Sequence, residues 1–253
     1  MLVFHYFILY FDYTFFKNCY MKKQILVILF VYIVGTFAFA SDTLFTRYKY
    51  FIAKPKAIET LNTVQIIGVL VDDKNDSLEF VLHQILPDTL RLQVRFGETY
   101  AITVITGQTG WIVDPTRKIY QPKELLPDEI SRTKSNILNL FSFLDPNVFD
   151  NVQSRDIESL DTNYISFEVI NTTQDTIYYF FNKHDPTDGF RIVRFHLSPH
   201  FFKIIPKFLF SYAGFAIPRQ IEVIANEKKR TLMYIVNINF NSEIDRDLFL
   251  LKK

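Results

Sequence analysis

Residues 90–96 read Leu-Arg-Leu-Gln-Val-Arg-Phe, and this stretch decides the fold class. Its apolar residues alternate with arginine and glutamine, which is the period of an extended chain. The pattern predicts a β-strand with one face in apolar surroundings and the other in water. The apolar face consists of Leu90, Leu92, Val94 and Phe96.

Similar strand patterns lie on both sides of this stretch and are separated by short polar turns. Such short connections predict antiparallel neighbours, because parallel strands need crossovers of a dozen residues or more. The strands are expected at 63–71, 78–86, 100–106, 111–113, 118–121, 164–170, 176–182, 190–197, 217–225 and 231–240. Segment 200–215 is ambiguous between strand and helix, since Pro206 prevents a long regular helix.

Two helices accompany the strands. Leu44, Tyr48 and Phe51 recur at helical spacing, and this stripe stops at Pro55. A second helix is predicted from Pro127, with acidic residues in its first turn, to the Asp-Pro pair at 145–146. Its inward stripe is Ile130, Ile137, Phe141 and Leu144. Strands and helices together predict the α+β class.

The first forty residues are interpreted as lying outside the fold. Residues 21–40 combine two lysines, an apolar run and an Ala-Phe-Ala site, the pattern of a cleaved secretory signal. An uncleaved signal anchor is the alternative. Residues 1–20 precede this complete signal, so they are interpreted as an over-called start with Met21 as initiator; a hydrophobic hairpin is the alternative. Residues 41–253 are expected to form a single exported, periplasmic domain.

Composition and motifs argue against several classes of function. The formal net charge is +1, which offers no basic excess for binding nucleic acid. The chain has one cysteine, Cys19, so an internal disulfide framework and a cysteine-ligated metal site are excluded. No G-x-S-x-G elbow, P-loop or H-E-x-x-H motif occurs. We therefore expect no catalytic residues, no metal and no cofactor, and a protein that is not an enzyme.

Several strands are apolar on both faces, notably the run Ile-Tyr-Tyr-Phe-Phe at 177–181. Two apolar faces indicate a curved sheet that is covered on its concave side. The interior is then either a well-filled core or an apolar cavity that accepts an acyl chain or a similar group. Periodicity alone leaves both possibilities open.

Three further stretches carry a resemblance to a known family. These are 50–68, the hairpin Thr-Gly-Trp-Ile-Val-Asp-Pro at 109–115, and a C-terminal run from Tyr212 through Pro218 and Asn237 to Phe249. In order and spacing they resemble the LolA/LolB-like periplasmic lipoprotein carriers, the outer-membrane lipoprotein-sorting proteins. The likeness extends from about Leu44 to Phe249. It departs from the family at Leu86, where shuttle-type members have an arginine that fastens the lid, and at 53–56, which lack paired glycines.

The resemblance implies an incomplete antiparallel β-barrel, with helices lidding a concave hydrophobic face that holds acyl chains in transit. It also implies lipoprotein acyl chains or another lipid as ligand, with inner- and outer-membrane envelope proteins as possible partners and a monomeric carrier. A sensor or interaction module of the same fold, binding a membrane or envelope protein, is the alternative. The candidate cavity residues are Leu90, Leu92, Val94, Phe96, Phe141, Ile177 and Tyr179.

Overall fold

The computed structural model describes residues 51–140, 153–157, 163–170, 174–185, 187–196 and 199–251. All of them belong to one compact unit, Phe45–Lys253. Its first half is an antiparallel meander in which each strand pairs with the next. The strands are β1 (Thr63–Val71), β2 (Ser77–Ile85), β3 (Thr89–Phe96), β4 (Thr99–Thr106), β5 (Thr109–Asp114) and β6 (Ile119–Glu124).

The second half is a longer meander that is also antiparallel throughout. Its strands are β7 (Gln153–Ile157), β8 (Tyr164–Ile170), β9 (Thr176–Asn182), β10 (Gly189–Arg194), β11 (Phe201–Tyr212), β12 (Phe215–Ala225) and β13 (Lys229–Phe240). A 3-10 turn, η5 (Arg246–Phe249), follows β13 and packs against β3 and β4.

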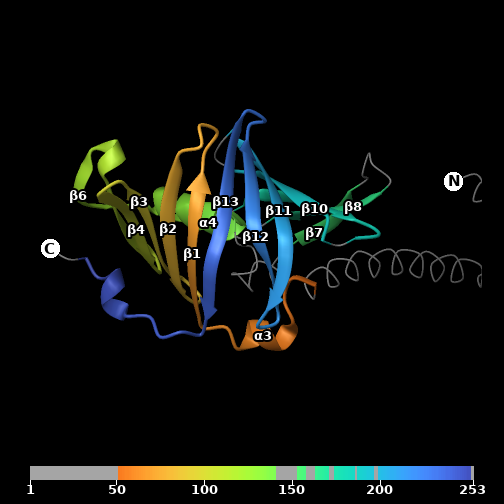
Figure 1. Ribbon diagram of the computed structural model, residues 1–253, viewed down its shortest axis with the longest axis horizontal. Coiled ribbons are helices and arrows are strands. Elements are labelled where there is room, and N and C mark those ends of the chain that lie inside the picture. Colours follow the sequence, from red (N-terminus) through yellow and green to blue (C-terminus); the bar gives the residue numbers. More distant parts are fainter. Residues whose placement is uncertain are drawn as a thin grey trace, which may run out of the picture. The chain divides into compact units, whose positions relative to one another are not determined.

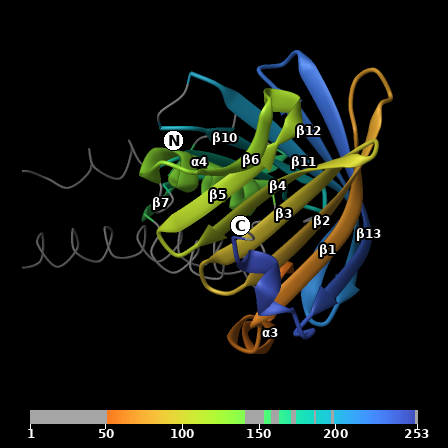
Figure 2. The same cartoon turned by 90° about the vertical axis from the view of Figure 1, so that its left-hand side faces the viewer.

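The first and last strands join the two meanders into one 13-stranded sheet, in the order β6-β5-β4-β3-β2-β1-β13-β12-β11-β10-β9-β8-β7. The pairing of β1 with β13 lies at its centre (Figure 1). The edge strands β6 and β7 do not pair with each other, so the sheet is an open, incomplete barrel. The sheet curves around its concave side, where helix α4 (Pro127–Leu140) lies (Figure 2).

The start of α4 follows from its sequence. Pro127 occupies the first helical position, where its missing N–H removes no helical bond. Glu129 reaches back and accepts a hydrogen bond from the Leu126 backbone N–H at 2.9 Å. Ile130 and Ile137, one helical face of α4, are buried in the same hydrophobic cluster as the concave face of the sheet. The helix therefore covers that face.

A second, shorter helix, α3 (Pro55–Glu59), precedes β1. The backbone N–H of Lys54 donates to the Gly214 carbonyl at 2.8 Å, which attaches α3 to the β11–β12 turn. In the described ranges, none of the helices combines the length and the apolar character needed to cross a bilayer.

Most predicted strands are confirmed, and the ambiguous segment 200–215 is resolved as a strand, β11. Pro206 is tolerated there because the pairing of β11 with β10 ends at Ile204, which leaves one strand neighbour beyond that point. Strand β7 was not predicted. Pro55, expected to end a helix, also begins α3. Of the predicted helical stripes, Leu44, Tyr48, Phe141 and Leu144 lie outside the described residues.

Candidate functional site: the concave face beneath helix α4

The register of the central strands places their apolar residues on the concave face. Leu92 lies opposite the fully buried Leu82 of β2, and Val94 lies opposite Phe80. Leu90 is 3% exposed and belongs to the core cluster, whereas Leu92 and Val94 are half-buried and pack against it. Phe96 ends β3 beside the turn to β4 and is half-buried.

Ile177 and Tyr179 lie on β9, in the other half of the sheet, and each is 1% exposed. The Tyr179 ring stacks on Phe167 of β8 with 5.1 Å between ring centroids. The core cluster contains both residues together with Leu90, so the two halves of the sheet share one apolar interior. Phe141, which was expected beneath the lid, lies outside the described residues.

An apolar pocket of about 50 Å³ lies in this interior beside the C-terminal end of α4. Of the predicted cavity residues, Tyr179 lines it. The other lining residues are Phe51, Ile52, Leu140, Phe181, Thr187, Gly189, Phe190, Arg191, Pro206, Leu209, Ala216, Pro218 and Ile221. Ligand pockets in proteins usually measure roughly 300–1,000 Å³. This pocket, as it stands, is therefore too small for a whole acyl chain.

Helix α4 is attached to both halves of the sheet by side-chain hydrogen bonds. The Lys134 ammonium donates to the Gly107 carbonyl at 2.7 Å, in the turn between β4 and β5. On the other side, the Ser135 hydroxyl donates to the buried carboxylate of Asp175, just before β9. Asp175 also accepts from the His196 backbone N–H at 3.0 Å. These contacts hold the middle of α4 over the open interior.

A buried arginine holds the end of the same helix. Arg191 of β10 is 7% exposed, and its Nη2 donates to the Leu140 carbonyl at 3.0 Å. A cation at this position also interacts favourably with the negative end of the helix dipole. Burial raises the pKa of the neighbouring Tyr179 hydroxyl, and the positive charge of Arg191 acts against that rise. Arg191 thus fastens α4 from β10, a strand in which we predicted no such role.

Leu86, the position at which the sequence lacks the arginine discussed above, follows β2 directly and packs against the hydrophobic cluster. Arg191 was missed because its strand, Phe-Arg-Ile-Val-Arg-Phe at 190–195, has apolar residues on both faces and does not show which arginine is buried. The burial of Arg191 and the exposure of Arg194 become clear only from the register.

Gln84 places a polar atom on the concave face, between Val64 and Leu90 in the register. Gln84 is 2% exposed, and its Oε1 has no hydrogen-bond partner within the described part of the chain. A buried acceptor without a donor costs about 1–3 kcal/mol. A ligand that brings an N–H or O–H group to this point would remove that penalty.

No protein-family model and no curated protein sequence matches the chain. Solved structures do match. The LolA superfamily protein NE2245 from Nitrosomonas europaea superposes with a TM-score of 0.52 at 11% identity, over 83% of this chain and 97% of that one. A DUF1329 family protein from Desulfovibrio piger gives 0.51 at 9% identity, over 84% and 98%. The chain therefore has a LolA-like fold, as the sequence resemblance implied.

Proposed function

We propose that the protein is a non-enzymatic periplasmic carrier that binds lipoprotein acyl chains, or another lipid, between α4 and the concave face of the sheet. The observation that carries the proposal is an unclosed sheet whose concave face is apolar and is covered by helix α4. The cargo would be delivered towards the outer membrane, with membrane or envelope proteins as donor and acceptor. The LolA-like fold supports this class of function.

The physical problem that such a carrier solves is the transfer of hydrocarbon through water. Each buried CH₂ group is worth about 0.8 kcal/mol, so a chain of about 15 such groups gains roughly 12 kcal/mol on leaving water. The concave face offers apolar side chains from both meanders for this burial. A carrier must also release its cargo, and this requires a cover that can move.

Helix α4 meets that requirement. Its contacts with the sheet are apolar side chains, Ile130 and Ile137, and hydrogen bonds at Lys134, Ser135 and Leu140. An acyl chain that enters the interior would replace the apolar contacts of α4 with its own. The exchange leaves the buried apolar area nearly unchanged, so the opening of α4 is compensated by the ligand.

The direct test is the lipid content of purified protein, measured by mass spectrometry after organic extraction. We expect bound lipid in the native protein and its loss in Leu92→Glu, because this substitution puts a carboxylate on the half-buried concave face. Gln93→Glu, on the opposite face of the same strand, is the matched control and should retain lipid. Circular dichroism reports whether each variant is folded.

Two results would contradict the carrier. If Leu92→Glu unfolds and the native protein contains no lipid, the interior is an ordinary core. Lipid-free native protein that instead retains a tightly bound envelope protein would support an interaction module of the same fold.

A further inference from the structure

The outer face of β11–β13 is basic and partly apolar. Within these three strands Glu222 is the sole acidic residue, against Lys203, Lys207, Arg219, Lys229 and Arg230. The register aligns Lys203 with Ile224 and Ile224 with Arg230, on the side opposite the buried Ile204. We call the following set the basic face: Lys203, Lys207, Phe208, Arg219, Arg230, Tyr234 and Val236.

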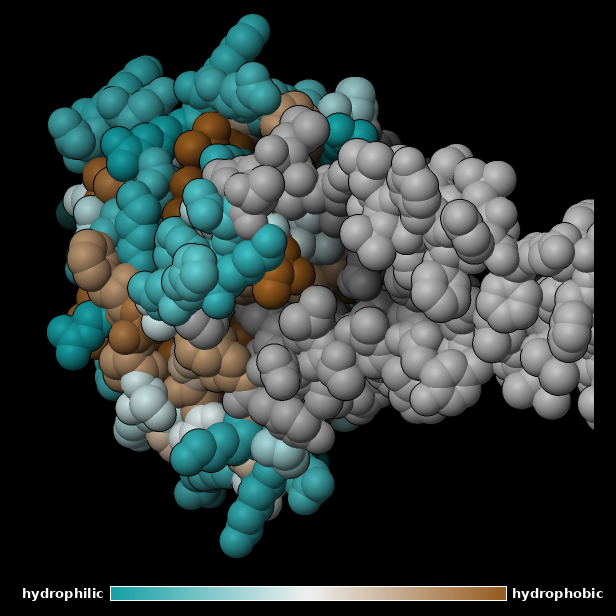
Figure 3. Space-filling view, turned by 90° about the vertical axis from the view of Figure 1, so that its right-hand side faces the viewer, coloured by the Kyte–Doolittle hydropathy of each residue, from teal (hydrophilic) through white to brown (hydrophobic). Residues whose placement is uncertain are grey.

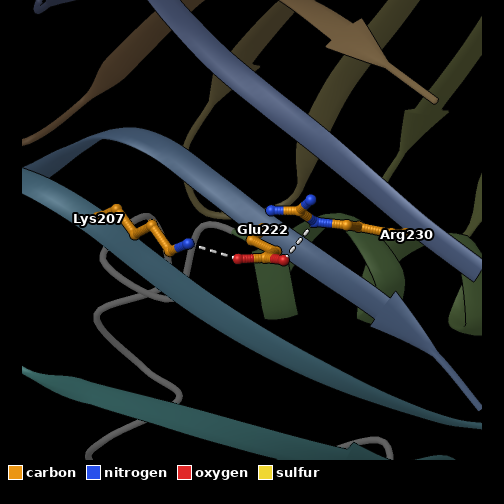
Figure 4. Close-up of polar contacts among 3 residues, drawn as sticks. All are labelled: Lys207, Glu222 and Arg230. Atoms are coloured by element: carbon orange, nitrogen blue, oxygen red, sulfur yellow. Dashed lines mark hydrogen bonds and ion pairs between the residues drawn. The ribbon is translucent and has the colours of Figure 1, made fainter. Parts of the chain in front are cut away.

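The one carboxylate of these strands is already neutralised. Lys207 Nζ lies 2.6 Å from one oxygen of Glu222, and Arg230 Nε lies 2.5 Å from the other (Figure 4). The hydrogen bond from Lys207, and after it that from Arg230, lowers the pKa of the Glu222 carboxyl although burial opposes the shift. With one negative charge shared between two cations, the triad keeps a net positive charge.

The two other cations of the basic face have aromatic neighbours. Lys203 Nζ lies 4.2 Å from the centroid of the Phe190 ring, and the guanidinium of Arg219 lies 5.3 Å from that of Phe210. Arg219 is exposed, and no carboxylate contacts it among the described residues. Its charge is therefore available to an anionic partner.

Large apolar side chains are exposed beside these cations. Phe208 and Val236 are each 69% exposed, and Tyr234 is 39% exposed. Two backbone irregularities turn Phe208 and Val236 outward. Phe208 has a φ of 54°, and Val236 is the extra residue of a bulge against β1. Figure 3 views the molecule from the side of β7–β10 and shows hydrophobic residues between hydrophilic ones on that side.

A groove of about 370 Å³ lies at the same place. The pairing of β12 with β13 extends from Ala225 to Gln220 and stops there, so the two strands separate beyond that point. Arg219 stands at the groove, whose other lining residues are Phe210, Tyr212, Ile235, Val236, Asn237, Ile238 and Asn239. Where β12 begins and β13 ends, the rings of Phe215 and Phe240 are 4.7 Å apart.

We propose that the basic face docks onto an anionic phospholipid surface, with Arg219 binding a headgroup phosphate in the groove. Exposed aromatic and aliphatic side chains beside lysine and arginine are the combination that favours the membrane interface. Each such cation contributes about 1 kcal/mol near an anionic bilayer. The contact between the Phe215 and Phe240 rings bridges the unpaired ends of β12 and β13, and this disfavours a peptide strand inserted between them. Docking of this kind goes beyond carriage, since it positions the protein on a membrane whether or not the interior holds lipid.

The test is amide hydrogen exchange of the full chain with vesicles of phosphatidylcholine alone or mixed with phosphatidylglycerol. Because exchange is measured segment by segment along the chain, it distinguishes docking through the basic face from membrane contact elsewhere in the chain. We expect amides of 208–212 and 235–239 to become protected with phosphatidylglycerol and to lose protection at high salt. Removing one cation by Arg219→Gln should lower the vesicle partition coefficient about fivefold.

Phe208→Asn, which suits the left-handed backbone, should weaken binding further. The matched control is Tyr120→Asn with Lys123→Gln, which removes an exposed aromatic residue and a cation from the edge strand β6. Equal protection with both kinds of vesicle, protection elsewhere on the sheet, or equal binding by Arg219→Gln and the control would overturn the proposal. Lipid extracted from the interior is measured separately, so failure of docking and failure of carriage are distinguishable.

Discussion

Replacing Arg191 by methionine should loosen helix α4 without unfolding the sheet. Arg191 is 7% exposed, and its Nη2 donates to the carbonyl of Leu140 in α4 at 3.0 Å. A hydrogen bond that involves a charged group contributes about 1.5–3 kcal/mol. Taking about 2 kcal/mol for this bond, the equilibrium constant for opening α4 rises about 30-fold, since 1.4 kcal/mol is a factor of ten.

Native-state hydrogen exchange measures this opening directly. We expect amides in the last turns of α4 to exchange about 30-fold faster in Arg191→Met, while the amides of β1, β2 and β13 keep their native rates. Arg194→Met is the matched control: Arg194 lies on the same strand but is exposed, with its guanidinium 5.4 Å from the centroid of the Tyr178 ring. It should leave α4 unchanged.

Two results would refute the reasoning. Equal acceleration in α4 and in the central strands would mean that Arg191 stabilises the whole domain rather than the position of the helix. Unchanged exchange in α4 would mean that the bond to Leu140 contributes nothing to keeping it closed.

Two further predictions concern the sheet. Because hydrogen bonds from Lys207 and Arg230 lower the pKa of Glu222 below its ordinary value of 4.5, the triad stabilises the fold fully above that value. This contribution is lost as the pH falls through the lower, folded-state pKa. Urea unfolding between pH 6 and pH 3 should show a decline in the unfolding free energy. Glu222→Gln should make that decline smaller. Gly68→Ala should lower the unfolding free energy by about 1–3 kcal/mol, because a Cβ there would lie 2.3 Å from the Tyr234 carbonyl oxygen. Thermal unfolding measures this, and a melting temperature equal to that of the native protein would contradict it.

The strands that sequence predicts best are those with one polar and one apolar face. In β3 the alternation of leucine with arginine and glutamine shows both the strand and its inward side, and the register agrees. The alternating pattern fails to predict the structure where a strand departs from its two-residue period. Val236 is inserted as a bulge in β13, and Pro206 has a place in β11 only because the pairing of β11 with β10 stops at Ile204. Neither feature can be predicted from the residue itself, because each depends on how the neighbouring strand pairs.

The candidate site shows the same limit more strongly. The alternation in β3 indicates that Leu90 faces the interior, whereas the run at 177–181 is apolar on both faces and does not show that Ile177 points the same way. The sequence cannot indicate that Arg191 is buried at the end of α4, because this depends on a contact between segments about fifty residues apart. The volume of the interior is also a collective property: how closely α4 packs is decided by every side chain beneath it.

The strand order explains why opening and stability can be separated in this fold. Residues between β6 and β7 must pass from one edge of the sheet to the other, because these strands are the two ends of the strand order. Helix α4 is in that connection and contributes no strand to the sheet, whose central pairing is made by β1 and β13. Moving α4 therefore breaks its own hydrogen bonds and apolar contacts but no strand pairing. A helix in that position can expose the interior while the curved sheet beneath it keeps its shape, and this is the mechanical requirement for a carrier that must both hold and release hydrocarbon.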